Sequence, residues 1–344
     1  MSASLAALLV LGACTTSDPE TETDPTPAAD AALVGEADTL VVYSGRSEEL
    51  VGPVFAAFEE ESGIDLDVRY GDTAEMAAQI LEEGDNSPAD VYFGQDAGAL
   101  GALEAADAFV ELPSDLIDGV DERYRSVNSE WVGITARSRT VVYNPETLNE
   151  DDLPDSILDF ADEEWRGRVG WAPTNGSFQA FVTALRELEG EEAAREWLTE
   201  MKDLETRVYT NNRSQVAAVA AGEIDAGLVN HYYAMQESAA NPDLNAANYF
   251  FPAGDPGALV NVAGVGILAT SEAQETAGEL VAYLLDTEAQ TAFAEESFEY
   301  PLVEGVAIDD KLKPLDELEP PDIDLANLED LEGTLALLRE VGLL

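Results

Sequence analysis

Short apolar runs of the kind found in buried strands alternate with amphipathic helical patterns along most of this chain, and this order restricts the fold most strongly. Residues 40–43 and 89–93 are two such runs. Between them, five large apolar residues recur at three- and four-residue spacing, which marks one face of a helix. They are Leu50, Val51, Val54, Phe55 and Phe58. The alternation favours an α/β fold with a mainly parallel sheet.

The same alternation continues through the rest of the sequence. Further strands are predicted at residues 64–70, 131–134, 140–144, 168–172, 207–209, 226–229 and 260–268. Predicted helices include residues 73–83, 153–160, 191–201 and 273–285. A chain of 344 residues exceeds what one hydrophobic core usually supports, so we expect two lobes. The strands at 140–144 and 260–268 are the candidates for the connections between them.

Polar loops precede two of the predicted helices, each directly after a strand. They cover residues 174–177 and 211–214. The start of a helix offers unpaired backbone N–H groups and the positive end of the helix dipole, so it suits an anion. Ordinary N-capping would explain either loop alone. The two loops together favour a shared anion pocket.

Two adjacent tyrosines, Tyr232 and Tyr233, follow the strand-type run 226–229. We expect this strand to end at the carboxyl edge of the sheet, where open α/β sheets bind ligands, with both phenol groups in a loop. A phenolate is a hard, anionic oxygen donor, so the pair suits a hard cation. Aromatic packing is the alternative for the pair taken alone. His231, the only histidine, should point to the other side of an extended segment and lie outside the metal site.

The net charge of the chain is −55, from 71 acidic and 16 basic residues. Nucleic acid and anionic membrane surfaces bind basic patches, so neither is an expected partner. Such charge often accompanies disorder, but 46% of the residues are apolar, which indicates a folded protein. An acidic surface adapted to high salt, where charges are screened over about 3 Å, explains both observations. We therefore expect the protein to lose structure in low salt.

Cys14 is the only cysteine, so an internal disulfide is not possible. It follows the apolar segment 5–13, which is too short to span a bilayer. Residues 11–14 resemble a bacterial lipobox, in which the cysteine is acylated and becomes the mature amino terminus; a core strand is the alternative. We expect a lipoprotein signal segment over residues 1–14 and a disordered acidic linker over residues 15–37.

Six short motifs occur along the chain in the same order as in one known protein family. They are residues 42–46, 88–92, 95–100, 137–144, 173–178 and 230–233. Together they resemble the periplasmic ferric-ion-binding proteins, the solute receptors of Fe(III) ABC importers, over about residues 38–305. The resemblance implies a two-lobed type II periplasmic-binding-protein fold, with mixed, mainly parallel sheets and hinge strands between the lobes. We expect lobe 1 over residues 38–138 and 264–310, lobe 2 over 139–263, and a C-terminal helical tail over 311–344.

By position, the resemblance implies that Tyr232 and Tyr233 are two phenolate ligands of Fe(III). A synergistic anion, phosphate or carbonate, would complete the coordination. The residues implied to hold this anion are Asn175, Gly176, Ser177, Asn212 and Asn230.

The chain departs from the family pattern in the first lobe. Ser47 stands where the family has a histidine ligand, and Gln95, followed by Asp96, stands where it has a glutamate. Gln95 and Asp96 are therefore candidate further ligands. No extra tyrosine lies near Asn175, as it does in members with three or more tyrosine ligands. Four arginines stand out because cations are scarce, and each either faces the cleft or forms a surface ion pair. They are Arg46, Arg137, Arg139 and Arg213.

These observations predict an extracellular solute-binding lipoprotein of an ABC importer, which captures Fe(III) with its anion and delivers it to a membrane permease. We expect a monomer on the extracytoplasmic face of the cell membrane, periplasmic or at the cell surface, held only by the lipid on Cys14. The same fold could instead take a phosphonate, a polyamine or thiamine. A hydrolytic enzyme is disfavoured because the sequence has no serine elbow, no usable Cys–His pair and no HExxH pattern.

Overall fold

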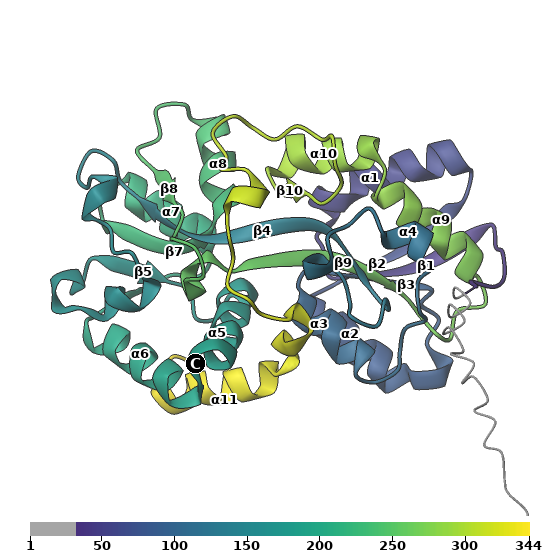
Figure 1. Ribbon diagram of the computed structural model, residues 1–344, viewed down its shortest axis with the longest axis horizontal. Coiled ribbons are helices and arrows are strands. Elements are labelled where there is room, and N and C mark those ends of the chain that lie inside the picture. Colours follow the sequence, from purple (N-terminus) through teal and green to yellow (C-terminus); the bar gives the residue numbers. More distant parts are fainter. Residues whose placement is uncertain (1–31) are drawn as a thin grey trace, which may run out of the picture. The chain divides into compact units, whose positions relative to one another are not determined.

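The computed structural model of the protein describes residues 32–344 (Figure 1). The predicted anchor Cys14 and residues 15–31 of the predicted linker lie outside the described residues. The described chain forms a 10-stranded sheet surrounded by helices, so the predicted α/β class is confirmed. None of the helices in this part of the chain has both the length and the apolar character that a membrane span requires.

The strands are short except for two long ones, β4 and β9. In chain order they are β1 (Thr39–Ser44), β2 (Asp65–Tyr70), β3 (Val91–Gly94), β4 (Val132–Tyr143), β5 (Val169–Trp171), β6 (Arg207–Val208), β7 (Ala226–Asn230), β8 (Ala247–Tyr249), β9 (Val260–Ile267) and β10 (Tyr300–Pro301).

Helices follow most of the strands directly. They are α1 (Glu48–Ser62), α2 (Thr73–Glu83), α3 (Ala97–Glu104), α4 (Ser114–Ile117), α5 (Gly176–Glu189), α6 (Glu191–Asp203), α7 (Asn212–Ala220), α8 (His231–Ala240), α9 (Gln274–Leu284), α10 (Thr287–Ser297) and α11 (Leu331–Val341). Among the 3₁₀ turns, η4 (Ile157–Ala161) and η8 (Leu325–Glu329) matter below.

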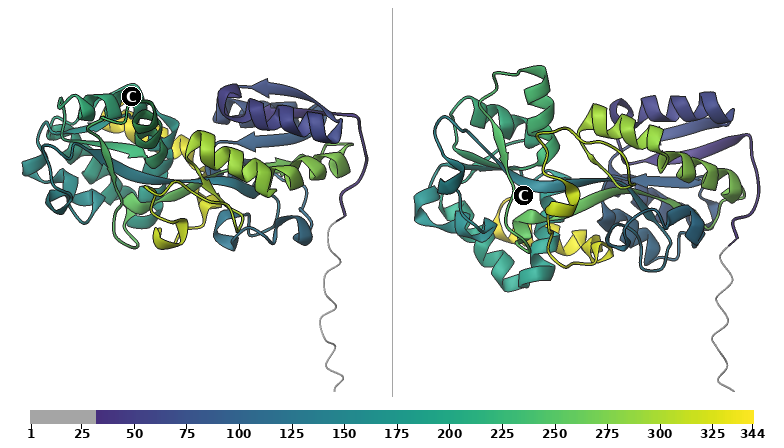
Figure 2. Two further views of the ribbon diagram at one scale, coloured as in Figure 1. Left: turned by 90° about the horizontal axis from the view of Figure 1, so that it is seen from above. Right: turned by 45° about the horizontal axis from the view of Figure 1, so that its top comes forward.

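The sheet is mixed, with neighbouring strands in the order β2-β1-β3-β9-β4-β7-β5-β6. The pairs β1–β2, β1–β3, β5–β6 and β5–β7 are parallel, whereas β9 and β4 run antiparallel to their neighbours. Helices lie between the strands of each parallel pair along the chain, because parallel strands need a crossover connection. Figure 2 shows α1 in purple near the light-green α9 and α10, and the rings of Phe58 and Tyr283, 5.4 Å apart, join α1 to α9.

Strand β4 connects two groups of strands. Its first part, residues 132–138, pairs with β9, while residues 139–143 pair with β7. The sequence predicted two strands here, at 131–134 and 140–144; instead one continuous, fully buried strand spans both. The intervening residues remain extended because their backbone groups pair with β9, a contact that local sequence does not reveal.

Helix α1 forms as its pattern predicts. Val51, Val54, Phe55 and Phe58 are buried, and Gly63 ends the helix in the left-handed conformation with φ of 76°. Its N–H group donates to the carbonyl of Glu59 at 3.0 Å, which is a typical glycine C-cap. The helix predicted over residues 153–160 is wrong: residues 153–156 form an irregular bend and η4 follows it, and the segment buries Leu153, Ile157 and Phe160.

Candidate functional site

The two tyrosines lie in the first turn of α8, not in a loop. Strand β7 ends at Asn230 and α8 begins at His231, so no loop separates them. Tyr232 is buried and Tyr233 is half-buried. Their ring centroids are 4.3 Å apart, with an angle of 33° between the ring planes. The strand-to-helix junction therefore holds two phenol groups side by side.

The surroundings of Tyr232 keep its phenol neutral in the absence of a metal. Burial raises the pKa of Tyr232 well above its usual 10.0, and Tyr233 and Glu299 raise it further, whereas Arg137 lowers it. Removing this proton therefore requires a strong positive charge close to the oxygen. A bound metal ion supplies such a charge.

Three arginines lie fully buried near the tyrosines. Arg46 forms two hydrogen bonds to the carboxylate of Glu299, at 3.0 and 2.5 Å, and both side chains are inaccessible to solvent. The carboxylate also accepts hydrogen bonds from the hydroxyls of Thr135 and Ser297, at 3.2 and 3.3 Å. Although burial raises the pKa of Glu299, the positive charge of Arg46 lowers it below its usual value. Glu299 is therefore charged and fully satisfied.

The other two buried arginines keep donors free. Arg137 donates from Nη2 to the carbonyl of Gln95, and among the described residues its Nη1 has no partner. Arg139 donates from Nη1 to Asn230 Oδ1 at 3.1 Å, while its Nε and Nη2 find no partner in residues 32–344. Burial lowers the pKa of Arg139 to about 10, so it remains a cation at neutral pH. Unpaired buried donors of this kind call for an anionic partner.

The structure brings the predicted anion-binding residues into one network. Asn175 caps α5: its Oδ1 accepts from the backbone N–H and the hydroxyl of Ser177, at 3.1 and 2.5 Å. Asn212 Nδ2 donates to Asn175 Oδ1 at 3.1 Å and to Ser177 Oγ at 3.2 Å. Arg139 reaches the same hydroxyl at 3.5 Å and links it to Asn230.

Gly176 is the first residue of α5, and nothing lies within 4 Å of the position a Cβ would take there. The backbone at the start of this helix is therefore open to a ligand.

A cavity of about 520 Å³ separates residues of the two strand groups. Gln95, Asp96 and Arg137 line it from one group, and Asn175, Gly176 and Ser177 line it from the other. Tyr232, Tyr233, Asn212 and Asn230 are not among its lining residues. The predicted residues thus form two sets, one that lines the cavity and one that does not.

The first-lobe candidates have different surroundings. Asp96 caps α3 by accepting the N–H of Ala99 at 3.1 Å. Burial raises the pKa of its carboxyl, although Arg137 and backbone N–H groups lower it. Ser47, which the resemblance predicts at the position of a histidine ligand, is exposed and precedes α1 without a side-chain cap.

His231 is held by the backbone through both ring nitrogens. Nδ1 accepts the N–H of Ser138 at 3.2 Å, so Nε2 carries the proton and donates to the carbonyl of Phe298 at 2.8 Å. The ring stacks on Tyr300 with the centroids 4.5 Å apart. With both nitrogens occupied, the imidazole has no lone pair free for a metal. In residues 32–344 no three His, Cys, Asp or Glu side chains cluster as a metal site would require.

Sequence reasoning identified the buried arginines only as scarce cations. Arg213, in contrast, forms a surface ion pair with Glu237 at 2.8 Å. Glu299 was missed, because nothing in the sequence distinguishes it among 71 acidic residues.

Comparison with known proteins identifies the family. A family model of bacterial extracellular solute-binding proteins matches residues 54–320. The Fe(3+)-binding periplasmic protein of Serratia marcescens is 36% identical over 308 residues, which are 89% of this chain and 90% of that protein. The major ferric iron-binding protein of Neisseria meningitidis serogroup B is 35% identical over 310 residues, covering 88% of this chain and 93% of that protein.

Comparison with solved structures supports the same family. Iron-bound HitA from Pseudomonas aeruginosa matches with a TM-score of 0.82 and 38% identity, over 88% of this chain and 99% of that one. Apo FutA2 from Synechocystis matches with a TM-score of 0.77 and 28% identity, over 89% and 99%. The predicted type II periplasmic-binding-protein fold is confirmed, as is the prediction of a transport protein and not an enzyme. The chain belongs to the bacterial extracellular solute-binding proteins and, among them, to the periplasmic ferric-ion-binding proteins.

Proposed function

We propose that this protein captures Fe(III) together with a small oxyanion outside the cytoplasm and delivers it to the permease of an ABC importer. The side-by-side phenols of Tyr232 and Tyr233, among three buried arginines, are the observation that carries this proposal. Relatives named as ferric-ion-binding proteins support it. Fe(III) is the cargo, and its two protein ligands from the second strand group are the two phenolate oxygens.

Iron binding in this site is coupled to proton release. Both phenols must ionise to bind a trivalent ion, and the pKa of Tyr232 is raised by burial. The ion favours the phenolate, so binding displaces protons and weakens as the pH falls. A falling pH or reduction to Fe(II) would therefore favour release.

The charge of the site explains the need for an anion. Arg46, Arg137 and Arg139 against Glu299 leave a buried net charge of +2. Fe(III) with two phenolates adds one more positive charge. A divalent anion, such as carbonate or hydrogen phosphate, offsets this increase and satisfies the free donors of Arg139 and Asn230. Asn175, Gly176, Ser177, Asn212 and Asn230 would hold it, with the start of α5 supplying backbone N–H groups.

Closure of the two lobes would complete the site. We take lobe 1 as residues 38–138 and 264–310 and lobe 2 as residues 139–263. The change of partner along β4 supports the boundary between residues 138 and 139, whereas residues 260–263 of β9 pair with residues 135–138 of lobe 1. Gln95 or Asp96 would then approach the iron from lobe 1. We place the protein as a monomer on the extracytoplasmic face of the membrane, anchored through a lipid on Cys14.

The buried arginines argue against a cationic ligand such as a polyamine or thiamine. A cation would add positive charge to a site where three buried arginines already outnumber the one buried carboxylate, that of Glu299. A phosphonate remains compatible with the anion residues. It is distinguished from iron by the absence of a metal-dependent colour.

Ferric loading tests the proposal. The loaded protein should show a phenolate-to-Fe(III) charge-transfer band in the visible spectrum. Tyr232→Phe and Tyr233→Phe should each weaken the band and the double variant should abolish it, while Tyr283→Phe, at the α1–α9 contact, should leave it unchanged. A colourless wild-type protein after loading, with a thermal shift on adding a phosphonate alone, would overturn the iron assignment.

Substitution of Arg139 tests whether this side chain binds the anion. Arg139→Met removes a charge-assisted hydrogen bond that typically contributes about 1.5–3 kcal/mol, so iron retention against citrate should fall at least about tenfold. Arg166→Met, which removes an exposed ion pair with Glu163, is the control. Equal retention by both variants would show that Arg139 does not hold the anion.

A further inference from the structure

The last part of the chain lies across the cavity from one wall to the other. We call residues 325–341, which comprise η8 and α11, the C-terminal strap; it is the yellow segment that runs from α3 to α5 and α6 in Figure 1. Leu328, Glu329 and Leu331 line the cavity, as do Gly98 and Ala99 of α3 and Ala180 and Thr183 of α5. The strap thus contacts the same two helices that face each other across the cavity.

We propose that the C-terminal strap limits how far the two walls of the cavity can separate, and so how far the protein opens to release its cargo. This inference rests on the two-lobed site proposed above.

The strap is attached to α3 through close backbone contact. A Cβ on Gly98 would lie 2.4 Å from the carbonyl oxygen of Leu328, and a Cβ on Gly101 would lie 2.4 Å from that of Ala326. Real Cβ atoms do not approach carbonyl oxygens this closely, so both positions require glycine. Leu325 and Leu328 are also buried. This end of the strap is therefore packed onto α3 and not laid loosely over it.

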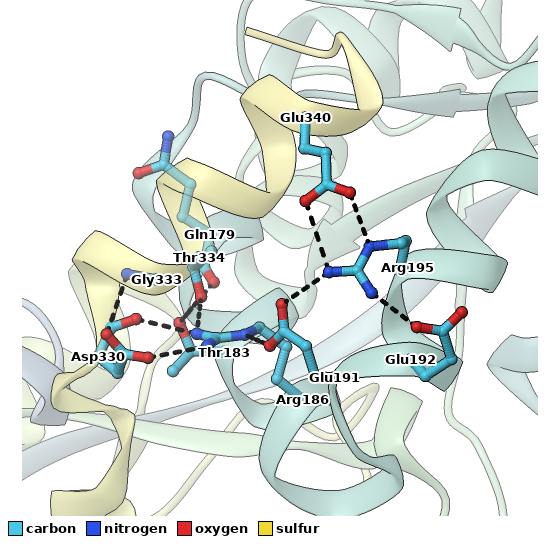
Figure 3. Close-up of polar contacts among 10 residues, drawn as sticks. All are labelled: Gln179, Thr183, Arg186, Glu191, Glu192, Arg195, Asp330, Gly333, Thr334 and Glu340. Atoms are coloured by element: carbon cyan, nitrogen blue, oxygen red, sulfur yellow. Dashed lines mark hydrogen bonds and ion pairs between the residues drawn. The ribbon is translucent and has the colours of Figure 1, made fainter.

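The other end is attached to α5 and α6 by polar contacts (Figure 3). The hydroxyls of Thr183 and Thr334 are 2.8 Å apart and buried. Arg186 donates to Thr334 Oγ1 at 3.0 Å and to a carboxylate oxygen of Asp330 at 2.8 Å. Arg195 donates to Glu340 at 3.1 Å. Lys202 also donates to the carbonyl of Val341, at 2.5 Å.

The segment of the strap that joins its two attachments is short. Leu328 contacts α3 and Asp330 contacts α5, so only Glu329 lies between them. Two residue steps of fully extended chain span at most about 7 Å. The walls cannot move apart by more than a few ångströms without loss of one attachment. Three of the 16 basic residues of this chain hold the strap to α5 and α6, which indicates that this attachment is specific.

Releasing either attachment tests the proposal. Gly101→Ala forces the carbonyl of Ala326 off α3, and Gly52→Ala, whose Cβ meets only the flexible Glu48 side chain at 3.4 Å, is the matched control in α1. Thr334→Val removes the hydrogen bonds that Thr334 forms with Thr183 and Arg186, so it weakens the second attachment, and it serves if Gly101→Ala does not fold. In a Cys14→Ser background, spin labels at the exposed positions Glu82→Cys and Glu200→Cys report the distance between the walls.

In metal-free protein, Gly101→Ala and Thr334→Val should each extend the label distances to longer values, whereas Gly52→Ala should match the parent. Iron dissociation should accelerate several-fold with an unchanged visible spectrum. Parent-like distances in both folded variants would overturn the role of the strap, whatever the iron result. Longer distances in variants of a protein that never acquires the ferric colour would support the role of the strap and overturn the iron proposal.

Discussion

At the scale of single residues, His231 makes the stability of the metal-free protein depend on pH. Burial lowers the pKa of its imidazole from 6.5 to about 4. The unfolded chain therefore binds a proton below pH 6.5 that the folded protein excludes until about pH 4. The contribution is fully present above pH 6.5 and is lost as the pH falls towards 4, by about 3 kcal/mol in total.

His231→Gln isolates this contribution, because it removes the only imidazole and leaves every carboxylate in place. We expect the difference in unfolding free energy between the parent and the variant to shrink by about 3 kcal/mol between pH 7 and pH 4. Urea denaturation at several pH values measures it. A difference that is constant with pH would contradict the neutral, buried state of this histidine.

The sequence can predict a site residue when the partners of that residue lie close to it in the sequence. Asn175 and Ser177 are predictable because a polar run before an amphipathic helix has a local meaning: its side chains cap the helix. Arg139 is ambiguous, since burial and surface pairing follow equally from a lone cation. Glu299 is not predictable, because its role arises from Arg46, 253 residues away in sequence.

At the scale of elements, the stability of α7 depends on one cap. Asn211 Oδ1 accepts the N–H of Ser214 at 2.9 Å, and the hydroxyl of Ser214 accepts the N–H of Asn211 at 3.3 Å, which completes a capping box. Asn211→Ala should therefore destabilise the protein by about 1 kcal/mol.

Ser47→Ala is the matched control for this cap, since Ser47 occupies the same position before α1 but forms no side-chain cap. We expect it to change the unfolding free energy by less than about 0.5 kcal/mol. Equal losses in the two variants, measured by urea denaturation, would show that the capping hydrogen bonds of Asn211 do not stabilise α7.

The elements themselves were largely predictable, and the errors have physical causes. Helices such as α2 follow from periodicity, because one face must be apolar to be buried. The prediction of a loop for the tyrosines is wrong because α8 begins directly after β7; Asn230 is a common N-cap residue type, but its side chain forms no cap here. The single strand β4 also escaped prediction, since pairing with β9 keeps its middle extended.

At the scale of the whole molecule, the surface charge predicts a requirement for salt. The 71 carboxylates outnumber the 16 cations so far that 55 remain unpaired even if every cation forms an ion pair. Their mutual repulsion acts over about 10 Å at 0.1 M salt and over about 3 Å at 1 M. Screening weakens the few surface ion pairs, such as that of Arg195 with Glu192, but each contributes little. The balance therefore favours folding as salt increases.

We expect the melting temperature to rise steeply between 0.05 and about 1 M NaCl and then to level off, because the screening length changes little beyond that range. Sucrose at equal osmolality is the control: it strengthens apolar burial without screening charge, so it should not reproduce the steep rise. At pH 4, where many carboxylates are protonated, the dependence on salt should be weaker. A melting temperature that does not respond to NaCl at neutral pH, or that responds equally to sucrose, would show that the repulsion between carboxylates does not limit the stability of this protein.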